Sequence, residues 1–249
     1  MKNKKLFTTF IVNSLFSLYT FAGINMEESD TQIQVTRIGE GPIIYPELDP
    51  SIGQNIQGPS VIKVPKWVKQ PLGKYYIYFA DHKGKYIRLA YSNDLLGPWK
   101  IHQAGTLHIK DTDLPKQRVT MSDDIYERLK TKYRKMGIDI DNFPYDPKIE
   151  LTTPHIASPD VHIDEINQQI VMYFHGLKSA GKQVSRVARS SDGIHFKALK
   201  EDLGNTYLRK FFYGGFHYAL AMPGQLYRSK NGLTDFEKGP RLFNINMRH

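Results

Sequence analysis

The sequence predicts an all-β protein of the β-propeller class, built from repeated four-stranded units. Runs of apolar, β-branched and aromatic residues, typical of strands, recur along most of the chain. Three turn segments share a Ser, an Asp or Asn two residues later, and then an aromatic residue: AYSNDLLGPW, ARSSDGIHF and YRSKNGLTDF. Four short antiparallel strands per unit of roughly 40–50 residues are typical of a propeller blade.

Ser92, Ser190 and Ser229 mark corresponding points of the three units. The Asp or Asn at each turn can bond backbone amides, and Gly193 and Gly232 can supply a positive φ. A β-sandwich has strands of similar length but gives no reason for this recurrence. We therefore expect the three serines at equivalent corners of successive blades.

Each unit contains four expected strands, in the same order. The first unit has them at residues 55–64, 73–82, 85–92 and 98–102. The second has them at 157–163, 168–175, 185–190 and 195–199. The third has them at 208–214, 216–222, 225–229 and 236–239. Before them, residues 33–38 alternate like a short half-buried strand, and a Gly- and Pro-rich loop follows.

Residues 104–153 interrupt the repeat between the first two units and contain one expected helix, at 122–137. Ser122 suits the N-cap, and Gly137 suits the C-terminal stop. Spacings of three and four residues give one apolar stripe, made of Ile125, Leu129, Tyr133 and Met136. The stripe either packs on the propeller or belongs to a lid or specificity insert over the pore mouth.

The N-terminus predicts a signal peptide over residues 1–22. Lys2, Lys4 and Lys5 precede a mostly apolar run, and Thr20-Phe21-Ala22 has the small-x-small pattern of a cleavage site. The alternative is an uncleaved anchor helix, but its Asn, Ser and Thr residues make a poor membrane span. We expect a periplasmic or extracellular protein with an extension at 23–53 and a partial propeller domain at 54–249.

Composition narrows the classes of partner. The chain has 249 residues, a net charge of +9 and no cysteine, so disulfides and cysteine-bound metals are excluded. A net positive charge indicates either anionic partners or a generally basic soluble protein. The sequence contains no compact run of Lys and Arg beyond the N-terminus. Nucleotide-binding motifs are absent. We expect no cofactor, no nucleic acid partner and no membrane contact in the mature form.

One resemblance joins these motifs. GPSVI followed by GKYYIYFADHKGKYIRLAYSNDLLGPW resembles the first blade of five-bladed propeller glycoside hydrolases of family 43 and related type, the arabinanase and xylosidase group. The resemblance covers about Asn55 to Phe236, except the insertion. It implies a five-bladed propeller and a carbohydrate substrate. It also implies three carboxylates on the inner strands: a general base, an Asp that tunes the pKa, and a Glu general acid.

Of the three carboxylates that the resemblance implies, this sequence has a match for one. Gly58-Pro59 stands where the resemblance implies the acidic base. Asp160, after Ser158-Pro159, matches the pKa-tuning Asp, and we predict it as the catalytic residue. The strand near Tyr207–Phe211 offers Arg209 and Lys210 instead of a Glu.

Other polar residues crowd the ends of the expected strands. His155 and His162 flank Asp160, and His217 opens the corresponding strand of the third unit. A histidine near an Asp can act as a general acid or base, although such histidines also orient neighbours by hydrogen bonds. The sequence has no HxxxH-type spacing on one element, so it does not predict a metal site. The predicted substrate-binding residues are Asp81, His82, His155, His175, Arg248 and His249.

Three function classes fit these residues. The first is a glycoside hydrolase acting on a poly- or oligosaccharide, with Asp160 in the pore. The second is a non-catalytic sugar-binding propeller that has lost its carboxylates. The third is a phosphorylase-like or lyase-like enzyme that uses Arg and His for an anionic group. Three units are visible and a fourth would begin near residue 246, so we also expect a truncated propeller that self-associates through an open edge.

Overall fold

The computed structural model of the 249-residue chain describes residues 34–37 and 39–243. The chain divides into two compact units, Met1–Arg37 and Ile38–His249. Residues 34–37 of the first unit form no helix or strand, so the predicted strand at 33–38 is wrong over those positions. The predicted signal peptide lies outside the described residues.

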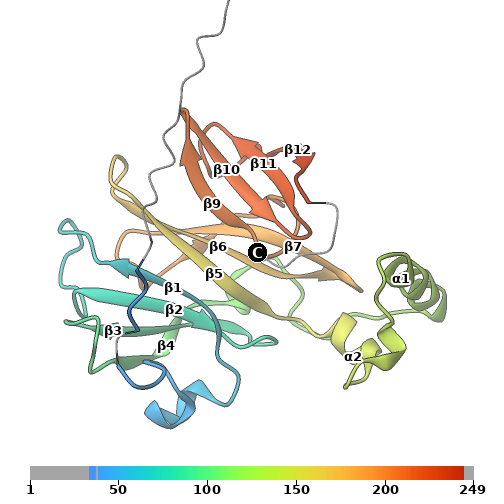
Figure 1. The fold of residues 1–249 in the computed structure, drawn as a ribbon, viewed down its shortest axis with the longest axis horizontal. Helices are drawn as coiled ribbons and strands as arrows, with labels where there is room; N and C mark the ends of the chain where they lie inside the picture. The colour runs from blue at the N-terminus through green and yellow to red at the C-terminus, as the bar shows by residue number, and fades with distance from the viewer. Residues whose placement is uncertain (1–33, 38, 244–249) are drawn as a thin grey trace, which may run out of the picture. The chain divides into compact units, whose positions relative to one another are not determined.

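The second unit is mostly β, with three four-stranded antiparallel sheets (Figure 1). The first sheet contains β1 (Gln57–Lys63), β2 (Tyr75–Ala80), β3 (Tyr86–Ser92) and β4 (Lys100–His108). The second contains β5 (Ile156–Asp164), β6 (Gln169–Ser179), β7 (Lys182–Ser190) and β8 (Lys197–Ala198). The third contains β9 (Arg209–Tyr213), β10 (Phe216–Ala221), β11 (Gln225–Ser229) and β12 (Glu237–Arg241). Each expected strand of the three units therefore has a counterpart.

Strands β2 and β6 form the centre of their sheets because apolar side chains cover both of their faces. In β2, Tyr76 and Tyr78 point into the core shared with the second sheet, whereas Ile77 and Phe79 point the opposite way. All four of these side chains are buried. Full burial of such a side chain contributes about 1.5–3 kcal/mol, so these strands carry much of the stability.

Three apolar clusters hold the sheets together. One lies between the first and second sheets and includes Tyr78 and Met172. Another lies between the second and third sheets and includes Tyr173 and Tyr227. The remaining face of the first sheet is covered by the segment 44–56, which contains the short 3-10 helices η1 (Pro46–Leu48) and η2 (Pro50–Ile52). Successive sheets therefore stack face to face.

The turn serines occupy equivalent corners, as predicted. Each is the last residue of the third strand in its sheet. The hydroxyl of Ser92 accepts the N–H of Asp94 at 3.1 Å, and the hydroxyl of Ser190 accepts that of Asp192 at 3.2 Å. The hydroxyl of Ser229 accepts the N–H of Asn231 at 3.3 Å. The same local hydrogen bond thus closes the turn in all three sheets.

The insertion begins later than predicted, because β4 continues to His108. It contains η3 (Ile109–Asp111), α1 (Asp123–Lys135), η4 (Ile140–Asn142) and α2 (Pro147–Thr152). The hydroxyl of Ser122 accepts the N–H of Ile125 at 3.3 Å, which confirms the predicted N-cap. In Figure 1 both α-helices lie beside one end of the second sheet.

The apolar stripe of α1 is only partly covered. Ile125, Leu129 and Tyr133 are half-buried and Met136 is exposed. Leu129 lies against the turn between β6 and β7, where a Cβ on Gly181 would come within 2.4 Å of its Cδ1. The stripe therefore contacts the second sheet through Leu129.

Each sheet is an open meander, and the count of five blades and the truncation stay predictions. Among the described residues, no helix is both long enough and apolar enough to cross a membrane.

Candidate functional site

The strand register shows which residues of the first strands correspond to one another. In each sheet the turn serine, at the end of the third strand, pairs with a residue of the second strand. Three residues further along the second strand, a second residue pairs with the first strand, and this pair is equivalent in the three sheets. The resulting pairs are Ser60–Tyr78, Asp160–Tyr173 and Arg209–Leu220. Asp160 thus occupies the position that Ser60 holds in the first sheet and Arg209 holds in the third.

Asp160 is surrounded by hydrogen-bond donors and positive charge. Its Oδ2 accepts the backbone N–H of Lys210 at 2.8 Å and lies 2.9 Å from Nε2 of His162. Its Oδ1 lies 3.9 Å from Nη1 of Arg209. We expected Asp160 to have few charged partners, and this was wrong: its carboxylate, which is 16% exposed, has the imidazole of His162 and the guanidinium of Arg209 beside it. That Asp160 faces a pore stays a prediction.

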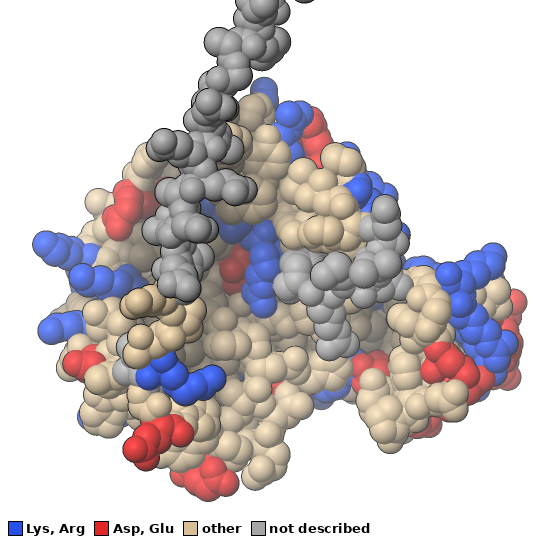
Figure 2. Space-filling model, viewed as in Figure 1, with Lys and Arg blue, Asp and Glu red and all other residues tan. Residues whose placement is uncertain are grey.

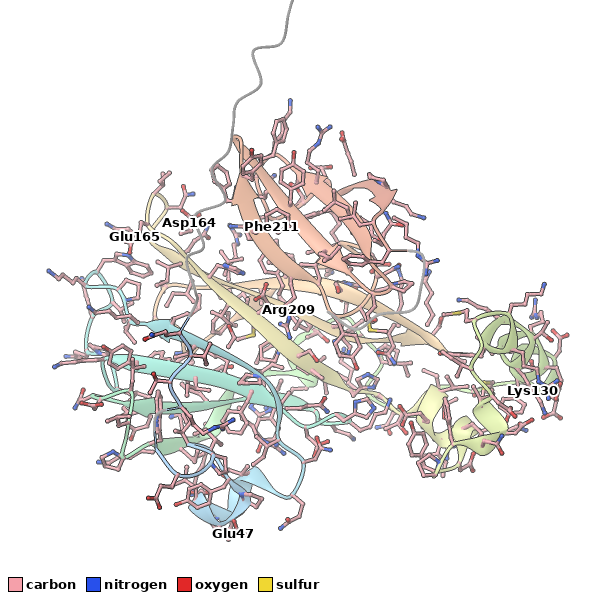
Figure 3. The ribbon with its side chains drawn as sticks, viewed as in Figure 1. Glu47, Lys130, Asp164, Glu165, Arg209 and Phe211 are labelled. Atoms are coloured by element: carbon pink, nitrogen blue, oxygen red, sulfur yellow. The ribbon has the colours of Figure 1, made fainter. Side chains whose placement is uncertain are left out.

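Arg209 holds its place through the backbone of the second sheet. Its Nη1 donates a 3.0 Å hydrogen bond to the carbonyl of Pro159, and its side chain is 35% exposed. Figure 3 shows Arg209 over β5, and Figure 2 shows basic and acidic side chains meeting in a hollow on this face. Asp160, His162 and Arg209, which we call the carboxylate cluster, therefore combine an anion, an imidazole and a cation at the junction of two sheets.

Nearby groups have shifted pKa values. Burial lowers the pKa of Lys210, although Asp160 opposes the shift. Burial also lowers the pKa of His217, with help from the positive charge of Lys210. Burial raises the pKa of Tyr173, and the charge of Asp160 adds to this. The ring of His162 meets that of Tyr173 edge-on, with centroids 5.9 Å apart.

Two residues before each of these equivalent positions, the backbone has a positive φ. The values are +61° at Gly58, +53° at Ser158 and +57° at Tyr207. Glycine tolerates this conformation, whereas Ser and Tyr adopt it at a cost in strain. A Cβ on Gly58 would lie 2.9 Å from Cα of Ser158. Glycine therefore stands where the resemblance implies an acid because the neighbouring strand leaves no room for a side chain.

Three of the predicted substrate-binding residues form a second group, which we call the histidine cluster. The ring centroids of His82 and His155 are 6.4 Å apart, and those of His155 and His175 are 5.8 Å apart. The ring of Tyr207 lies 4.6 Å from that of His175. We expected one of these histidines, or Asp81, within reach of Asp160, but the contacts of its carboxylate are with His162, Arg209 and Lys210.

The buried histidines are held neutral. Burial, with the nearby charge of Lys83, lowers the pKa of His155 to about 4. Burial lowers the pKa of His175 well below its usual value, and the positive charge of Arg209 contributes. Among the described residues, both ring nitrogens of His175 are buried without a hydrogen-bond partner. The described residues also contain no group of three or more His, Cys, Asp or Glu side chains that could hold a metal ion.

The remaining predicted residues lie elsewhere. Asp81 accepts the backbone N–H of Lys83 at 2.9 Å and lies 3.6 Å from Arg88. Arg248 and His249 lie outside the described residues. Strand β6 continues past His175 to Ser179, so this histidine lies within the strand instead of ending it.

Glu150 was missed from the sequence because it lies in the insertion. Its Oε1 is 3.1 Å from Nε2 of His82 and 2.7 Å from Nζ of Lys83. Burial would raise the pKa of Glu150, but the hydrogen bonds from His82 and Lys83 outweigh it and bring the pKa to about 2. This ion pair ties α2 to the turn that follows β2.

A cleft of about 370 Å³ lies between the insertion, the histidine cluster and the second and third sheets. Tyr133, Phe143 and Tyr145 line it from the insertion, and Tyr207 lines it from the start of the third sheet. Its polar lining includes His82, Glu150, Gln183 and Asn205. The sequence carried no signal for this cleft, because its walls come from distant segments.

No family model matches the chain. Among curated proteins, it is similar to an uncharacterized protein, R118, of Acanthamoeba polyphaga mimivirus, with 31% identity over 245 residues. The match covers 92% of this chain and 59% of that protein, so the chain spans little more than half the length of its relative.

The solved structures similar to this chain include glycoside hydrolases. A GH43_1 enzyme from Xanthomonas citri matches with a TM-score of 0.48 at 11% identity, covering 80% of this chain and 57% of that one. The GH43 BlXynB protein from Bacillus licheniformis matches at 0.47 and 18%, covering 80% and 34%. A family 117 glycoside hydrolase from Zobellia galactanivorans matches at 0.43 and 15%, covering 75% and 55%. These are enzymes of the group that the sequence motifs resemble, and at such scores their chemistry does not transfer to this chain.

Proposed function

We propose that this protein acts on a poly- or oligosaccharide as a glycoside hydrolase, with the carboxylate cluster as its reacting site. The observation that carries the proposal is the 2.9 Å contact between Asp160 and His162. Both side chains are partly exposed, at 16% and 30%, so a ligand can reach them. The motifs shared with family 43 glycoside hydrolases support a carbohydrate as the substrate.

Hydrolysis of a glycosidic bond needs a proton for the leaving oxygen and a base for the attacking water. In an Asp–His pair the carboxylate orients the imidazole and stabilises its protonated form. Because Nε2 of His162 faces Asp160, Nδ1 is the atom that gives its proton to the leaving glycosidic oxygen as the bond to the anomeric carbon breaks. Water then bonds to the anomeric carbon, and the imidazole, now unprotonated at Nδ1, takes up the proton that the water loses. Arg209 adjoins the same carboxylate and offers further N–H donors to sugar hydroxyls.

A second candidate function is sugar binding without hydrolysis. One observation favours it: the positions equivalent to Asp160 hold Ser60 and Arg209, so the first strands present no second carboxylate at the corresponding points. A binding protein needs aromatic and hydrogen-bonding groups but no opposed pair of acids.

The test is release of reducing ends from a panel of neutral and acidic oligosaccharides. We expect the chain to cleave at least one of them, and Asp160→Asn to abolish cleavage. Asp164→Asn is the matched control, because Asp164 lies on the same strand with its carboxylate bound to Asn167 and Gln169. Binding without cleavage would favour the second candidate function. An equal loss of cleavage in Asp160→Asn and Asp164→Asn would show that Asp160 has no specific role in the reaction.

A further inference from the structure

The cleft beside the insertion has the features of a ligand site separate from the carboxylate cluster. Its volume of about 370 Å³ lies at the lower end of the range for small-ligand pockets, roughly 300–1,000 Å³. The rings of Phe143 and Tyr145 pair on one wall, with centroids 5.4 Å apart. Tyr207 lines the cleft from the third sheet. Aromatic side chains therefore enter the cleft from two sides.

The polar lining favours an uncharged ligand. The negative charge of Glu150 is balanced by Lys83, whose Nζ lies 2.7 Å from its Oε1. Lys132 is the one Lys or Arg among the described residues that line the cleft. The amides of Gln183 and Asn205 supply both donors and acceptors. A phosphorylated ligand would need more positive charge than this lining offers.

A second, independent observation comes from the residues behind the cleft. His175 is 1% exposed, and neither of its ring nitrogens has a hydrogen-bond partner among the described residues. Its ring lies 4.6 Å from Tyr207, which adopts a positive φ of +57°. Unsatisfied buried polar atoms and strained non-glycine backbone are unfavourable for folding and are typical of ligand sites.

We propose that this cleft binds a neutral sugar ring at the end of a saccharide. The apolar face of the ring lies against Tyr145 or Tyr207, and its hydroxyls bond the amides of Gln183 and Asn205. Because Tyr207 precedes Arg209 by two residues, the same saccharide can continue from the cleft toward Asp160. This inference rests on the proposed function in one respect, that the ligand is a carbohydrate.

The experiment measures binding of xylobiose, cellobiose and digalacturonate to the full chain by titration calorimetry. We expect a neutral disaccharide to bind more tightly than the acidic one. Tyr145→Leu should weaken that binding by at least about tenfold, because it removes a stacking surface. Tyr45→Leu is the matched control and should leave the affinity unchanged, since Tyr45 lies outside the cleft and has similar exposure, 40% against 49% for Tyr145. Thermal melting of both variants checks that they fold.

The outcomes separate this inference from the proposed hydrolysis. Loss of binding in Tyr145→Leu alone supports the cleft even if the chain cleaves nothing. Cleavage that depends on Asp160, with the same KM in Tyr145→Leu and the wild type, would overturn the inference that the cleft binds the sugar. The proposed hydrolysis would still be supported. Tighter binding of digalacturonate, or no binding of any disaccharide, would overturn the inference as well.

Discussion

Asp160 and Ser60 occupy the same position in neighbouring sheets, and each accepts a hydrogen bond from the backbone of the next sheet. The hydroxyl of Ser60 accepts the N–H of Val161 at 2.9 Å, and the carboxylate of Asp160 accepts the N–H of Lys210 at 2.8 Å. A serine is sufficient for this link. The negative charge of Asp160 therefore exceeds what the link requires. The oxygen that accepts the N–H of Lys210, Oδ2, also contacts Nε2 of His162, and the second oxygen, Oδ1, faces Arg209.

Asp160→Asn should remove the negative charge of residue 160 but keep its hydrogen bond to the backbone of Lys210. The amide oxygen can still accept the N–H of Lys210, so the free energy of unfolding should change by less than about 1 kcal/mol. Cleavage should be lost while a saccharide still binds, because the charge beside His162 and Arg209 is gone but the other hydrogen-bonding groups remain. Urea unfolding together with an activity assay checks both. A large loss of stability with unchanged cleavage would make Asp160 structural.

Asp160→Leu should behave differently. It leaves the N–H of Lys210 and the ring of His162 without their acceptor. Leaving the N–H unsatisfied between the sheets costs about 1–3 kcal/mol, whereas the ring of His162, which is 30% exposed, can bond water instead. The same urea unfolding measurement should therefore show a clear loss of stability, and a leucine variant as stable as the asparagine variant would show that the link contributes little.

Gly58→Asp, which restores the acid that the resemblance implies, should destabilise the fold and produce no activity. Its φ is +61°, and a Cβ there would lie 2.9 Å from Cα of Ser158. Gly214→Asp is the matched control, because Gly214 has a φ of +54° with nothing within 4 Å of a Cβ. We expect Gly58→Asp to unfold more readily than the control by over about 1 kcal/mol in urea. Equal stability of the two variants would mean that the strands can separate to admit a carboxylate.

Stability should fall when the pH is lowered from about 6.5 to about 4. Burial lowers the pKa of His155 from 6.5 to about 4, so over this range the unfolded chain binds a proton that the folded chain does not. For one such group the free energy of unfolding decreases by up to about 3 kcal/mol. Glu150 and Asp192, with pKa values of about 2, lose their contribution only below about pH 4.5.

Urea unfolding at pH 7, 5.5 and 4 measures this dependence, with His155→Gln as the comparison. The variant should be less stable than the wild type at pH 7 and show a shallower decline. Parallel curves for the two proteins would show that His155 does not titrate as a buried group.

The outer face of the third sheet should promote self-association. In the first two sheets the corresponding face is buried against the next sheet. In the third sheet it carries Phe211, which is 47% exposed and stacks on Tyr218 at 5.5 Å. Sedimentation should detect oligomers of the wild type and fewer of Phe211→Ser. A monodisperse wild-type monomer would contradict this prediction.

Export stays a prediction, since residues 1–22 lie outside the described part of the chain. The basic, apolar and small-x-small pattern predicts cleavage close to Ala22. Mass spectrometry of the protein from its native host decides the matter. An intact Met1 on the intracellular protein would exclude export.

The repeated elements were predictable because their signals are local. The Ser-x-Asp/Asn turns and the apolar strands between them determine where each sheet begins and folds back. The pairing of Asp160 with His162 is local as well, because alternate residues of a strand share one face.

The rest of the site depends on contacts between distant segments. The link from Asp160 to Lys210 depends on how the second and third sheets pack and on the irregular register of β5 between Ala157 and Asp160, and no periodicity encodes either one. Glu150 reaches His82 from an insertion whose position the repeat does not specify. Asp81 was predicted as a substrate-binding residue, but the neighbouring strand places Arg88 beside it.

A crystal structure of Asp160→Asn with a bound oligosaccharide tests the central claim most directly. We expect a glycosidic oxygen or sugar hydroxyl within hydrogen-bond distance of residue 160 or Nδ1 of His162, about 2.6–3.2 Å. A saccharide bound elsewhere on the chain, with His162 and Arg209 making no contact to it, would show that the carboxylate cluster is not the reacting site.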